Sequence, residues 1–217
     1  MDRMKILILL IILLAGCGGA ATTDDKPELK LKPAIELVAH RGIGEPDNTI
    51  ESFTNALNLG FTSLETDLRM QGGKVVLAHD KTIDDQEYLS LEDFLIFASN
   101  TGAKIWIEAK ETKTIKPALD LLKRHNLDIV FISFRQTDVD LIKSLSPETS
   151  SGLIIDNASQ IDNANADWAV ISMKLLLSDH EKAKHLKIAA WTITGQQQYN
   201  DIEYLIDAAI TDVQITQ

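Results

Sequence analysis

Short apolar runs alternate with longer amphipathic segments from residue 34 to residue 217. Apolar residues that recur every three or four positions indicate helices, whereas short apolar runs bounded by turn residues indicate buried strands. The runs predict strands over residues 36–42, 62–68, 104–110, 128–134, 151–156, 168–173, 188–193 and 208–213. The segments between them predict helices near residues 49–59, 91–100, 114–126, 136–146, 158–165, 178–186 and 198–207. A further short strand is predicted at 74–80, after a Gln-Gly-Gly turn.

The first of these helices has the clearest local signals. Asn48 can cap its N-terminus, Glu51 can complete a capping box, and Gly60 can end it. We therefore expect the chain to enter the helix at Asn48, shortly after the first strand.

The alternation of strands and helices predicts an α/β fold with a parallel sheet, and eight parallel strands close a TIM (β/α)8 barrel. Residues 34–217 comprise 184 residues, whereas such barrels usually need about 200 or more. The predicted barrel is therefore compact, and no eighth helix is expected after the last strand. An open, doubly wound sheet is the structural alternative.

The first twenty residues have the organisation of an export signal. Arg3 and Lys5 precede ten uninterrupted apolar residues, Ile6 to Ala15, a run shorter than the roughly 20 residues that span a bilayer. The segment Leu14-Ala15-Gly16-Cys17 resembles a bacterial lipobox, in which the cysteine becomes the lipidated N-terminus. An ordinary secretory signal with a chance cysteine is the alternative.

Cleavage before Cys17 would divide the chain into three parts. Residues 1–16 would be the signal peptide, residues 17–33 the lipidated cysteine and a flexible polar tether, and residues 34–217 the folded domain. We expect the mature protein to be anchored to a membrane through Cys17, in the cell envelope on the extracytoplasmic side. Because Cys17 is the only cysteine, an intramolecular disulfide is excluded.

The chain is acidic. Its net charge is −11, and it becomes −12 when the leader, with two basic and one acidic residue, is removed. This charge argues against a nucleic-acid partner and against electrostatic docking on an anionic membrane. The sequence gives no indication of the oligomeric state.

Two strands carry acidic residues that are expected to share one face. Side chains two positions apart on a strand point the same way, so Glu65 and Asp67 lie together, as do Glu108 and Lys110. Carboxylates on one face repel each other unless a cation or proton lies between them, and oxygen ligands suit Mg²⁺ or Ca²⁺. Solvated side chains at a strand edge, or a simple Glu108–Lys110 salt bridge, are the alternatives.

Two histidines are expected at the same end of the predicted barrel, where the active sites of such folds are built. His40 ends the first strand, and His79 follows the short strand near 74–80. A pair of imidazoles can remove a proton from an attacking hydroxyl and supply one to a leaving oxygen, and Arg41 suits two oxygens of a phosphate. A structural role is the alternative for each histidine alone.

These residues resemble the motifs of the glycerophosphodiester phosphodiesterase family. Each motif is short, but together they follow the family's order from residue 36 to residue 213. The matching motifs are His40-Arg41-Gly42, Pro46-Asp47-Asn48-Thr49, Glu65-Thr66-Asp67, His79-Asp80, Glu108-Ala109-Lys110, Ser133-Phe134, Trp191-Thr192 and Thr211-Asp212.

The resemblance implies a TIM-barrel enzyme that cleaves glycerophosphodiesters to sn-glycerol 3-phosphate and an alcohol. It implies general acid/base catalysis by His40 and His79. The other implied roles are one divalent cation, Mg²⁺ or Ca²⁺, on Glu65, Asp67 and Glu108; phosphate contacts from Arg41 and Lys110; and Trp191 beside the glycerol.

The sequence departs from the family pattern at three places. Asp47 replaces the family's glutamate in Pro-Glu-Asn-Thr, and Thr194 stands where the family commonly has asparagine. The helical insertion that usually follows the His-Asp motif is reduced to a short segment before residue 91. We therefore expect a more open site, whose preferred alcohol does not follow from the family.

Two other functions are compatible with the sequence. One is a related phospholipase D-like or C-like barrel that acts on intact phospholipid. The other is a noncatalytic lipoprotein that binds phosphodiesters, although the intact set of candidate catalytic residues argues against it.

Overall fold

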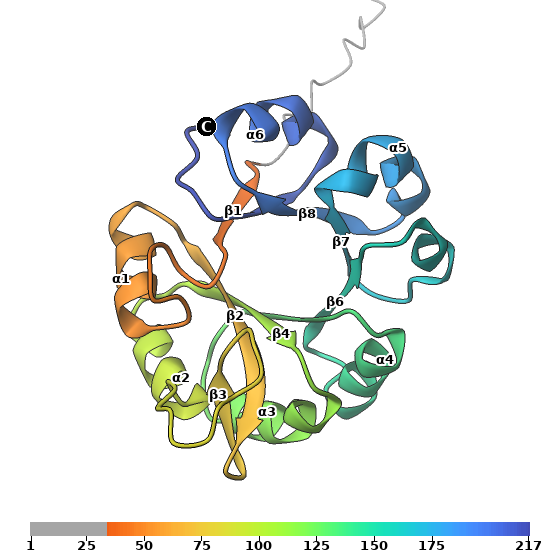
Figure 1. Ribbon diagram of the computed structural model, residues 1–217. Coiled ribbons are helices and arrows are strands. Elements are labelled where there is room, and N and C mark those ends of the chain that lie inside the picture. The colour runs from red at the N-terminus through yellow and green to blue at the C-terminus, as the bar shows by residue number, and fades with distance from the viewer. Residues whose placement is uncertain (1–33) are drawn as a thin grey trace, which may run out of the picture. The chain divides into compact units, whose positions relative to one another are not determined.

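Eight parallel strands form a closed ring in the computed structural model, which describes residues 34–217 (Figure 1). Strand β1 pairs in parallel with both β2 and β9, and this double pairing closes the ring. The strands of the ring are β1 (Glu36–Ala39), β2 (Ser63–Gln71), β4 (Lys104–Ala109), β5 (Ile129–Ser133), β6 (Ser150–Ile155), β7 (Trp168–Ser172), β8 (Lys187–Ile193) and β9 (Ala208–Thr211). The predicted TIM barrel is therefore confirmed, and the open sheet is excluded.

Helices surround the ring (Figure 1). They are α1 (Ile50–Asn58), α2 (Leu91–Ser99), α3 (Ile115–Leu122), α4 (Gln136–Leu145), α5 (Met173–Ala183) and α6 (Gln196–Ile202), with 3-10 turns η1 (Thr112–Thr114), η2 (Ala158–Asn163) and η3 (Glu203–Leu205). The helix predicted at 158–165 is a 3-10 turn, and the one predicted at 178–186 already begins at Met173. Within residues 34–217, no helix combines the length and apolarity needed to cross a membrane.

The extra strand, β3 (Lys74–Leu77), is antiparallel to β2 and lies outside the ring. Strand β2 consequently runs three residues past its predicted end at residue 68, because residues 68–71 pair with β3. Residues 78–90, between β3 and α2, contain no helix, in agreement with the short insertion expected there.

The predicted cap of α1 is wrong. Thr49 is the N-cap, and its hydroxyl accepts a hydrogen bond from Ser52 N while Ser52 Oγ accepts one from Thr49 N. Asn48 precedes the helix in a left-handed conformation, with φ of 55°. Its side chain is directed to strand β2 instead, as described below.

The barrel has an apolar layer on each side of its strands. Outward-facing side chains such as Leu64, Ile107 and Ile171 pack under the helices. Inside the ring, Trp106 and Trp168 meet edge to face, with ring centroids 4.8 Å apart. Because side chains alternate along a strand, Glu65 and Asp67 of β2 and Glu108 of β4 point to the inside of the barrel, opposite to Leu64 and Ile107.

The C-terminal residues occupy the flank where an eighth helix would lie. Ile215 is 6% exposed and belongs to the outer core. Gln214 Nε2 donates to the carbonyl of Leu59, and Gln217 Nε2 donates to the carbonyl of Ile35. Residues 212–217 thus cover this flank as an extended tail, without a helix.

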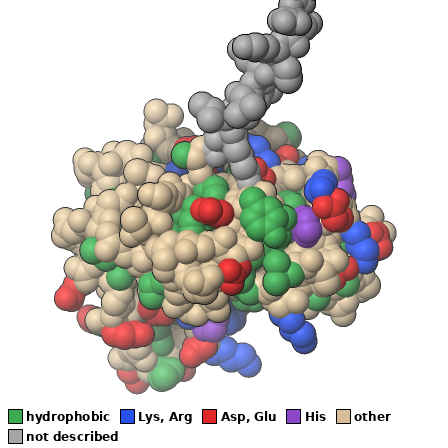
Figure 2. Space-filling model, turned by 90° about the horizontal axis from the view of Figure 1, so that it is seen from above, with side chains coloured by type: hydrophobic (Ala, Val, Ile, Leu, Met, Phe, Trp, Pro, Cys, Tyr) green, Lys and Arg blue, Asp and Glu red, His purple; other side chains and the backbone are tan. Residues whose placement is uncertain are grey.

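On the face shown in Figure 2, acidic, basic, histidine and hydrophobic side chains are interspersed. Large exposed hydrophobic side chains lie on elements all around the barrel: Ile50, Leu59, Ile83, Ile96, Leu145, Leu177 and Tyr204. They are scattered in the manner that is normal for a protein surface.

Glu36 is the centre of a polar cluster at the N-terminal end of the barrel. Its carboxylate accepts hydrogen bonds of 2.8 Å from Ser63 Oγ, Lys104 Nζ and Trp106 Nε1. The cluster joins three neighbouring strands at the end of the barrel opposite the carboxyl ends of the strands. It should stabilise the fold without taking part in chemistry.

We predict that Glu36→Ala lowers the free energy of unfolding by about 2–3 kcal/mol, because three polar groups lose their acceptor. Urea denaturation followed by circular dichroism measures this change. The control Glu51→Ala, at an exposed position of α1, should change the stability by no more than about 0.5 kcal/mol. Equal stability of the two variants would contradict the structural role of the cluster.

Candidate active site

Glu65, Asp67 and Glu108 form a cluster of buried carboxylates at the mouth of the barrel. One oxygen of each lies within 4.8 Å of one oxygen of the others. The register of the sheet explains this, because Asp67 is directly opposite Glu108 on the neighbouring strand. Their exposed fractions are 2%, 0% and 7%. The predicted grouping on one face is therefore observed.

Two cations face this cluster. Lys110 Nζ lies 3.1 Å from Asp67 Oδ1 and 2.8 Å from Glu108 Oε1. Arg41 Nε lies 3.1 Å from Asp67 Oδ2, and Arg41 N donates to Glu65 Oε2 at 3.1 Å. The carboxylate cluster thus has a fixed positive charge on either side, and the Glu108–Lys110 salt bridge exists as one part of it.

The pKa values in the cluster reflect burial and mutual repulsion. Burial raises the pKa of Glu65 well above its usual range, and the charges of Asp67 and Glu108 raise it further. Burial also acts to raise the pKa of Asp67, but Lys110 and Arg41 outweigh it and lower that pKa. The pKa of Glu108 is raised, chiefly by burial. Asp67 is therefore the ionised centre, and Glu65 most readily holds a proton.

The side chain of Asn48 fixes Asp67 from the other side. Its Nδ2 donates to Asp67 Oδ2 at 3.0 Å, and its Oδ1 accepts from Thr66 Oγ1 at 2.7 Å and from Asp67 N at 3.3 Å. The side chain is 4% exposed. The left-handed backbone of Asn48 allows this contact, which is why the residue serves the site rather than the helix.

The turn that carries Arg41 needs a glycine at the next position. Gly42 has φ of +83°, and a Cβ there would lie 2.5 Å from the backbone of Ser52. Arg41 itself is left-handed, with φ of 57°. Strand β1 ends at Ala39, so His40 and Arg41 belong to this turn and not to the strand. Gly42 thereby permits the close approach of the turn to α1.

Asp47 contacts Arg41. Its Oδ2 lies 3.3 Å from Arg41 Nη1 and accepts a hydrogen bond from it. The shorter side chain at this position therefore still reaches the guanidinium. Together with Asp67, Asp47 holds the planar group at two of its nitrogens.

His40 is fixed by the last strand of the barrel. Its Nδ1 lies 2.6 Å from Asp212 Oδ1, and its backbone N–H donates to the carbonyl of Thr211 at 3.0 Å. Because the carboxylate engages Nδ1, Nε2 is the ring nitrogen left to exchange a proton with a bound molecule. His40 and Asp212 are 172 positions apart in the sequence. They meet because β1 pairs with β9 when the ring closes.

His79 is held less firmly through its ring. Its Nδ1 lies 2.9 Å from Asp80 Oδ1, whose side chain is 95% exposed. Burial, followed by the charges of Lys110 and Arg41, lowers the pKa of His79 below 6.5. The imidazole is therefore neutral near pH 7 and suited to accept a proton.

Two cavities flank the Arg41–Asp47 pair. One, of about 500 Å³, is lined by His79 and by several residues of the segment that follows it, among them Lys81, Ile83 and Tyr88. The other, of about 370 Å³, is lined by His40 and Asp212. Arg41 and Asp47 line both cavities, so each imidazole shares a cavity with the same guanidinium.

Trp191 lies inside the mouth on β8. Its ring meets Phe134 edge to face at 5.4 Å, and Phe134 in turn lies 5.8 Å from Lys110 Nζ. Among residues 34–217, no hydrogen-bond partner is found for the buried Trp191 Nε1. The aromatic pair thus forms an apolar wall next to the cation of Lys110.

The comparisons with known proteins agree with these motifs. Residues 40–90 match the sequence profile of the glycerophosphoryl diester phosphodiesterase family. The predicted family is confirmed on this segment. A search of curated proteins finds no match to the chain.

Solved structures of the same fold come from several bacteria. A phosphodiesterase from Oleispira antarctica, solved in complex with the product sn-glycerol-3-phosphate, is 21% identical in sequence to this chain, and the two structures superpose with a TM-score of 0.72. The match covers 82% of this chain and 93% of the Oleispira chain. A glycerophosphodiester phosphodiesterase from Thermotoga maritima is 22% identical with a TM-score of 0.66, covering 84% and 96%. One from Parabacteroides distasonis is 18% identical with a TM-score of 0.72, covering 83% and 93%. At these identities the likeness shows the fold.

The family segment ends at residue 90 and therefore contains only part of the site. His40, Arg41, Glu65, Asp67 and His79 lie inside it. The other residues of the mouth, Glu108, Lys110 and Trp191, join them through the closed barrel. Sequence reasoning missed Arg69 and gave no role to Asp212, although Arg69 continues the alternation of Glu65 and Asp67 on β2.

The carboxylate cluster fits a divalent cation. Asp67 Oδ1 and Glu108 Oε1 are buried and, within the described residues, contact Lys110 without receiving a hydrogen bond of good geometry. All three donors are oxygens, as Mg²⁺ and Ca²⁺ prefer. With the three carboxylates ionised, Arg41 and Lys110 leave one negative charge uncompensated, which a cation can balance.

We predict that Mg²⁺ or Ca²⁺ binds at this cluster and raises the melting temperature, because a ligand that binds only the folded state stabilises it. Isothermal titration calorimetry should give one site. Glu108→Gln should weaken binding by at least about tenfold, the smallest effect seen when even an outer contact of a metal site is lost.

The control variant is Asp201→Asn, at an exposed position of α6, which should bind the ion as the wild type does. Unchanged binding by Glu108→Gln, or no binding at millimolar concentrations, would contradict the site.

Proposed function

We propose that the protein hydrolyses glycerophosphodiesters to sn-glycerol 3-phosphate and an alcohol, with the help of a divalent cation. The observation that carries the proposal is the arrangement at the mouth: Arg41 contacts the buried carboxylate cluster and shares one cavity with His40 and another with His79. The family match over residues 40–90 supports the same activity. So does the product, sn-glycerol-3-phosphate, in the complex of the Oleispira protein.

The phosphate of the substrate would bind between Arg41 and Lys110. Both side chains are partly buried, and nearby carboxylates keep the pKa of each above its usual value despite the opposing effect of burial. They therefore stay charged. A diester phosphate carries one negative charge, and Arg41 can donate two parallel hydrogen bonds to its oxygens. Trp191 and Phe134 offer an apolar wall for the carbons of the glycerol.

Cleavage would begin with attack by the glycerol 2-hydroxyl on phosphorus. Neutral His79 accepts the hydroxyl proton while the new P–O bond forms. The P–O bond to the alcohol breaks, and its oxygen takes a proton from His40. Water then opens the cyclic phosphate with the two imidazoles in reversed roles, and sn-glycerol 3-phosphate is released.

A cation on Glu65, Asp67 and Glu108 would supply charge stabilisation for the phosphoryl oxygens. Arg41 and Lys110 act in the same direction as negative charge grows on those oxygens in the transition state. Asn48 keeps Asp67 in place, and Asp212 orients the ring of His40 so that Nε2 can give and then take back a proton. The chain's own residues thus bind, orient and exchange protons around one phosphate.

We predict that His40→Ala or His79→Ala lowers kcat by about 10²- to 10⁴-fold, since each removes a general acid or base. The assay follows the release of glycerol 3-phosphate from glycerophosphocholine and glycerophosphoethanolamine, with and without a chelator. Circular dichroism should show that both variants are folded.

The matched control is His185→Ala, because His185 is exposed and far along the chain in the segment before β8. It should keep wild-type turnover. Near-wild-type turnover by either active-site variant would refute their roles. Activity only on intact phospholipid would instead favour a phospholipase, and no activity with any divalent ion would favour a binding protein.

We further propose that Cys17 anchors the protein to the extracytoplasmic side of a bacterial membrane. Residues 1–33, which carry the signal, Cys17 and the tether, lie outside the described part of the chain. The support is the sequence itself: a short apolar run after two basic residues, followed by Leu-Ala-Gly-Cys. A lipid-anchored enzyme would meet its soluble substrate at the membrane surface.

We predict that the wild-type chain takes up radiolabelled palmitate in bacterial cells and sediments with membranes. Cys17→Ser should abolish both, because serine has no sulfur to carry the diacylglycerol and the chains that give stable anchoring are lost. Labelling of the serine variant, or equal sedimentation of the two proteins, would argue against the anchor.

A further inference from the structure

Arg69 lies two positions beyond Asp67 on the same face of β2. The last parallel pair between β2 and β4 is Leu68 with Ala109, so Arg69 already belongs to the hairpin formed with β3. Its side chain is 17% exposed. An arginine held inside the rim at this point needs partners for its donors.

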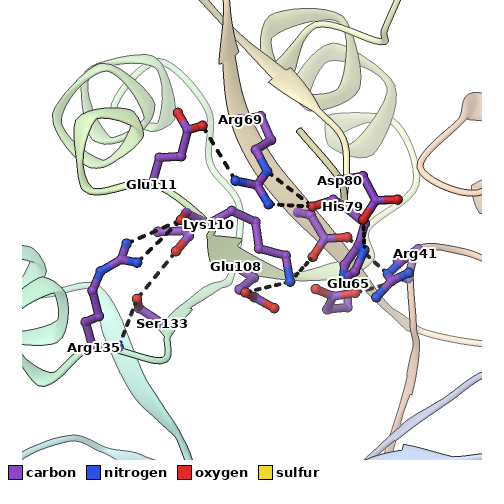
Figure 3. A network of polar contacts seen from close by, with 12 residues as sticks. Arg41, Glu65, Arg69, His79, Asp80, Glu108, Lys110, Glu111, Ser133 and Arg135 are labelled. Carbon is purple, nitrogen blue, oxygen red and sulfur yellow. Dashed lines mark hydrogen bonds and ion pairs between the residues drawn. The ribbon is translucent and has the colours of Figure 1, made fainter. Parts of the chain in front are cut away.

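The guanidinium of Arg69 bridges two segments of the rim (Figure 3). Its Nε and Nη2 both donate to the backbone carbonyl of His79, at 3.2 and 2.8 Å. Its Nη1 lies 3.5 Å from Oε1 of Glu111, the residue that follows Lys110 in the sequence. One side chain therefore connects β2, the turn that carries His79, and the segment that follows β4.

His79 depends on its backbone for its position more than His40 does. Ala78 N donates to the carbonyl of Asp67 at 3.0 Å, and His79 is the next residue along the chain. The ring contact to Asp80 is weak support, because that side chain is 95% exposed and exposed ion pairs contribute little. The two hydrogen bonds from Arg69 are thus the main polar restraint on the backbone at His79.

We propose that Arg69 is a positioning residue that sets the place of the His79 imidazole through the carbonyl of His79, with Glu111 holding its guanidinium. This inference rests on the proposed function of His79 as an acid/base group. The link also ties the His79 turn to the end of β4, which carries Lys110. The guanidinium of Arg69 therefore holds His79, the proposed proton acceptor, at a fixed position relative to Lys110, the proposed phosphate-binding cation.

A lysine cannot replace this contact. The guanidinium is planar and presents several donors in fixed directions, so two of them reach the carbonyl of His79 while a third faces Glu111. An ammonium group is a compact charge whose three donors have no planar, fixed arrangement. Charge at this position is thus not sufficient, and Arg69→Lys tests the geometry without removing the charge.

The first test compares steady-state kinetics of Arg69→Lys and Arg69→Gln with the control Arg124→Gln. Arg124 is 67% exposed, follows the C-terminal end of α3 and lies 3.6 Å from Glu92. We expect both Arg69 variants to lower kcat by at least about tenfold with KM within about twofold, because a small misplacement of a reacting group can cost about 10²-fold. The control should keep both constants. Equal kcat in all three variants would overturn the proposal.

The second test does not depend on activity. The ring protons of histidine are followed by NMR, with His79→Ala and His40→Ala identifying the two signals. In Arg69→Lys, the His79 signal should shift while the His40 signal stays in place. An unchanged His79 signal would overturn the proposal, even if turnover had fallen.

The role of Glu111 is tested by a double-mutant cycle. Glu111→Gln should reduce kcat less than Arg69→Gln does, and the double variant should resemble Arg69→Gln alone, because Glu111 acts through Arg69. Fully additive losses would show that the two residues act independently. Failure of the wild type to cleave any diester would refute the proposed function, whereas the NMR test would still decide whether Arg69 positions His79.

Discussion

The repulsion among three buried carboxylates is the constraint on which the mouth of the barrel depends. Glu65, Asp67 and Glu108 approach within 4.8 Å in a region that is almost closed to water. Such a group is stable only with cations or protons between its members. The turn after β1 bends back to bring Arg41 to one side, and the end of β4 brings Lys110 to the other. The residues that bind phosphate in the proposed reaction are thus the same ones that allow the carboxylates to be buried.

Much of this site follows from the sequence, because its elements obey simple alternation. Glu65 and Asp67 share a face of β2, and Lys110, directly after the end of β4, continues the face that carries Glu108. The parallel register then brings Asp67 opposite Glu108. The sequence contains eight strand signals separated by helical segments, and this number predicts a closed ring. In the structure, each of the eight strands of the ring pairs in parallel with its two neighbours.

The rest could not be predicted from local patterns. Asn48 has the chemistry of a helix cap, and its left-handed backbone, which directs it to Asp67, leaves no signal in a single sequence. The contact of His40 with Asp212 spans 172 residues and exists only once the barrel has closed. Arg69 continued a visible alternation, but its partner is a backbone carbonyl, and no side-chain motif reports such a partner. Tertiary contacts, rather than propensities, decide these positions.

The extended tail after β9 has a consequence for the connectivity of the fold. Gln217 Nε2 donates a hydrogen bond to the carbonyl of Ile35 at 2.7 Å, so the two ends of the described segment lie beside each other. A short peptide could join them, and new termini could be opened at the exposed turn between β2 and β3 without cutting the ring. Such a circular permutant would keep every strand pairing and the same mouth. The closed ring therefore does not depend on which strand comes first in the sequence.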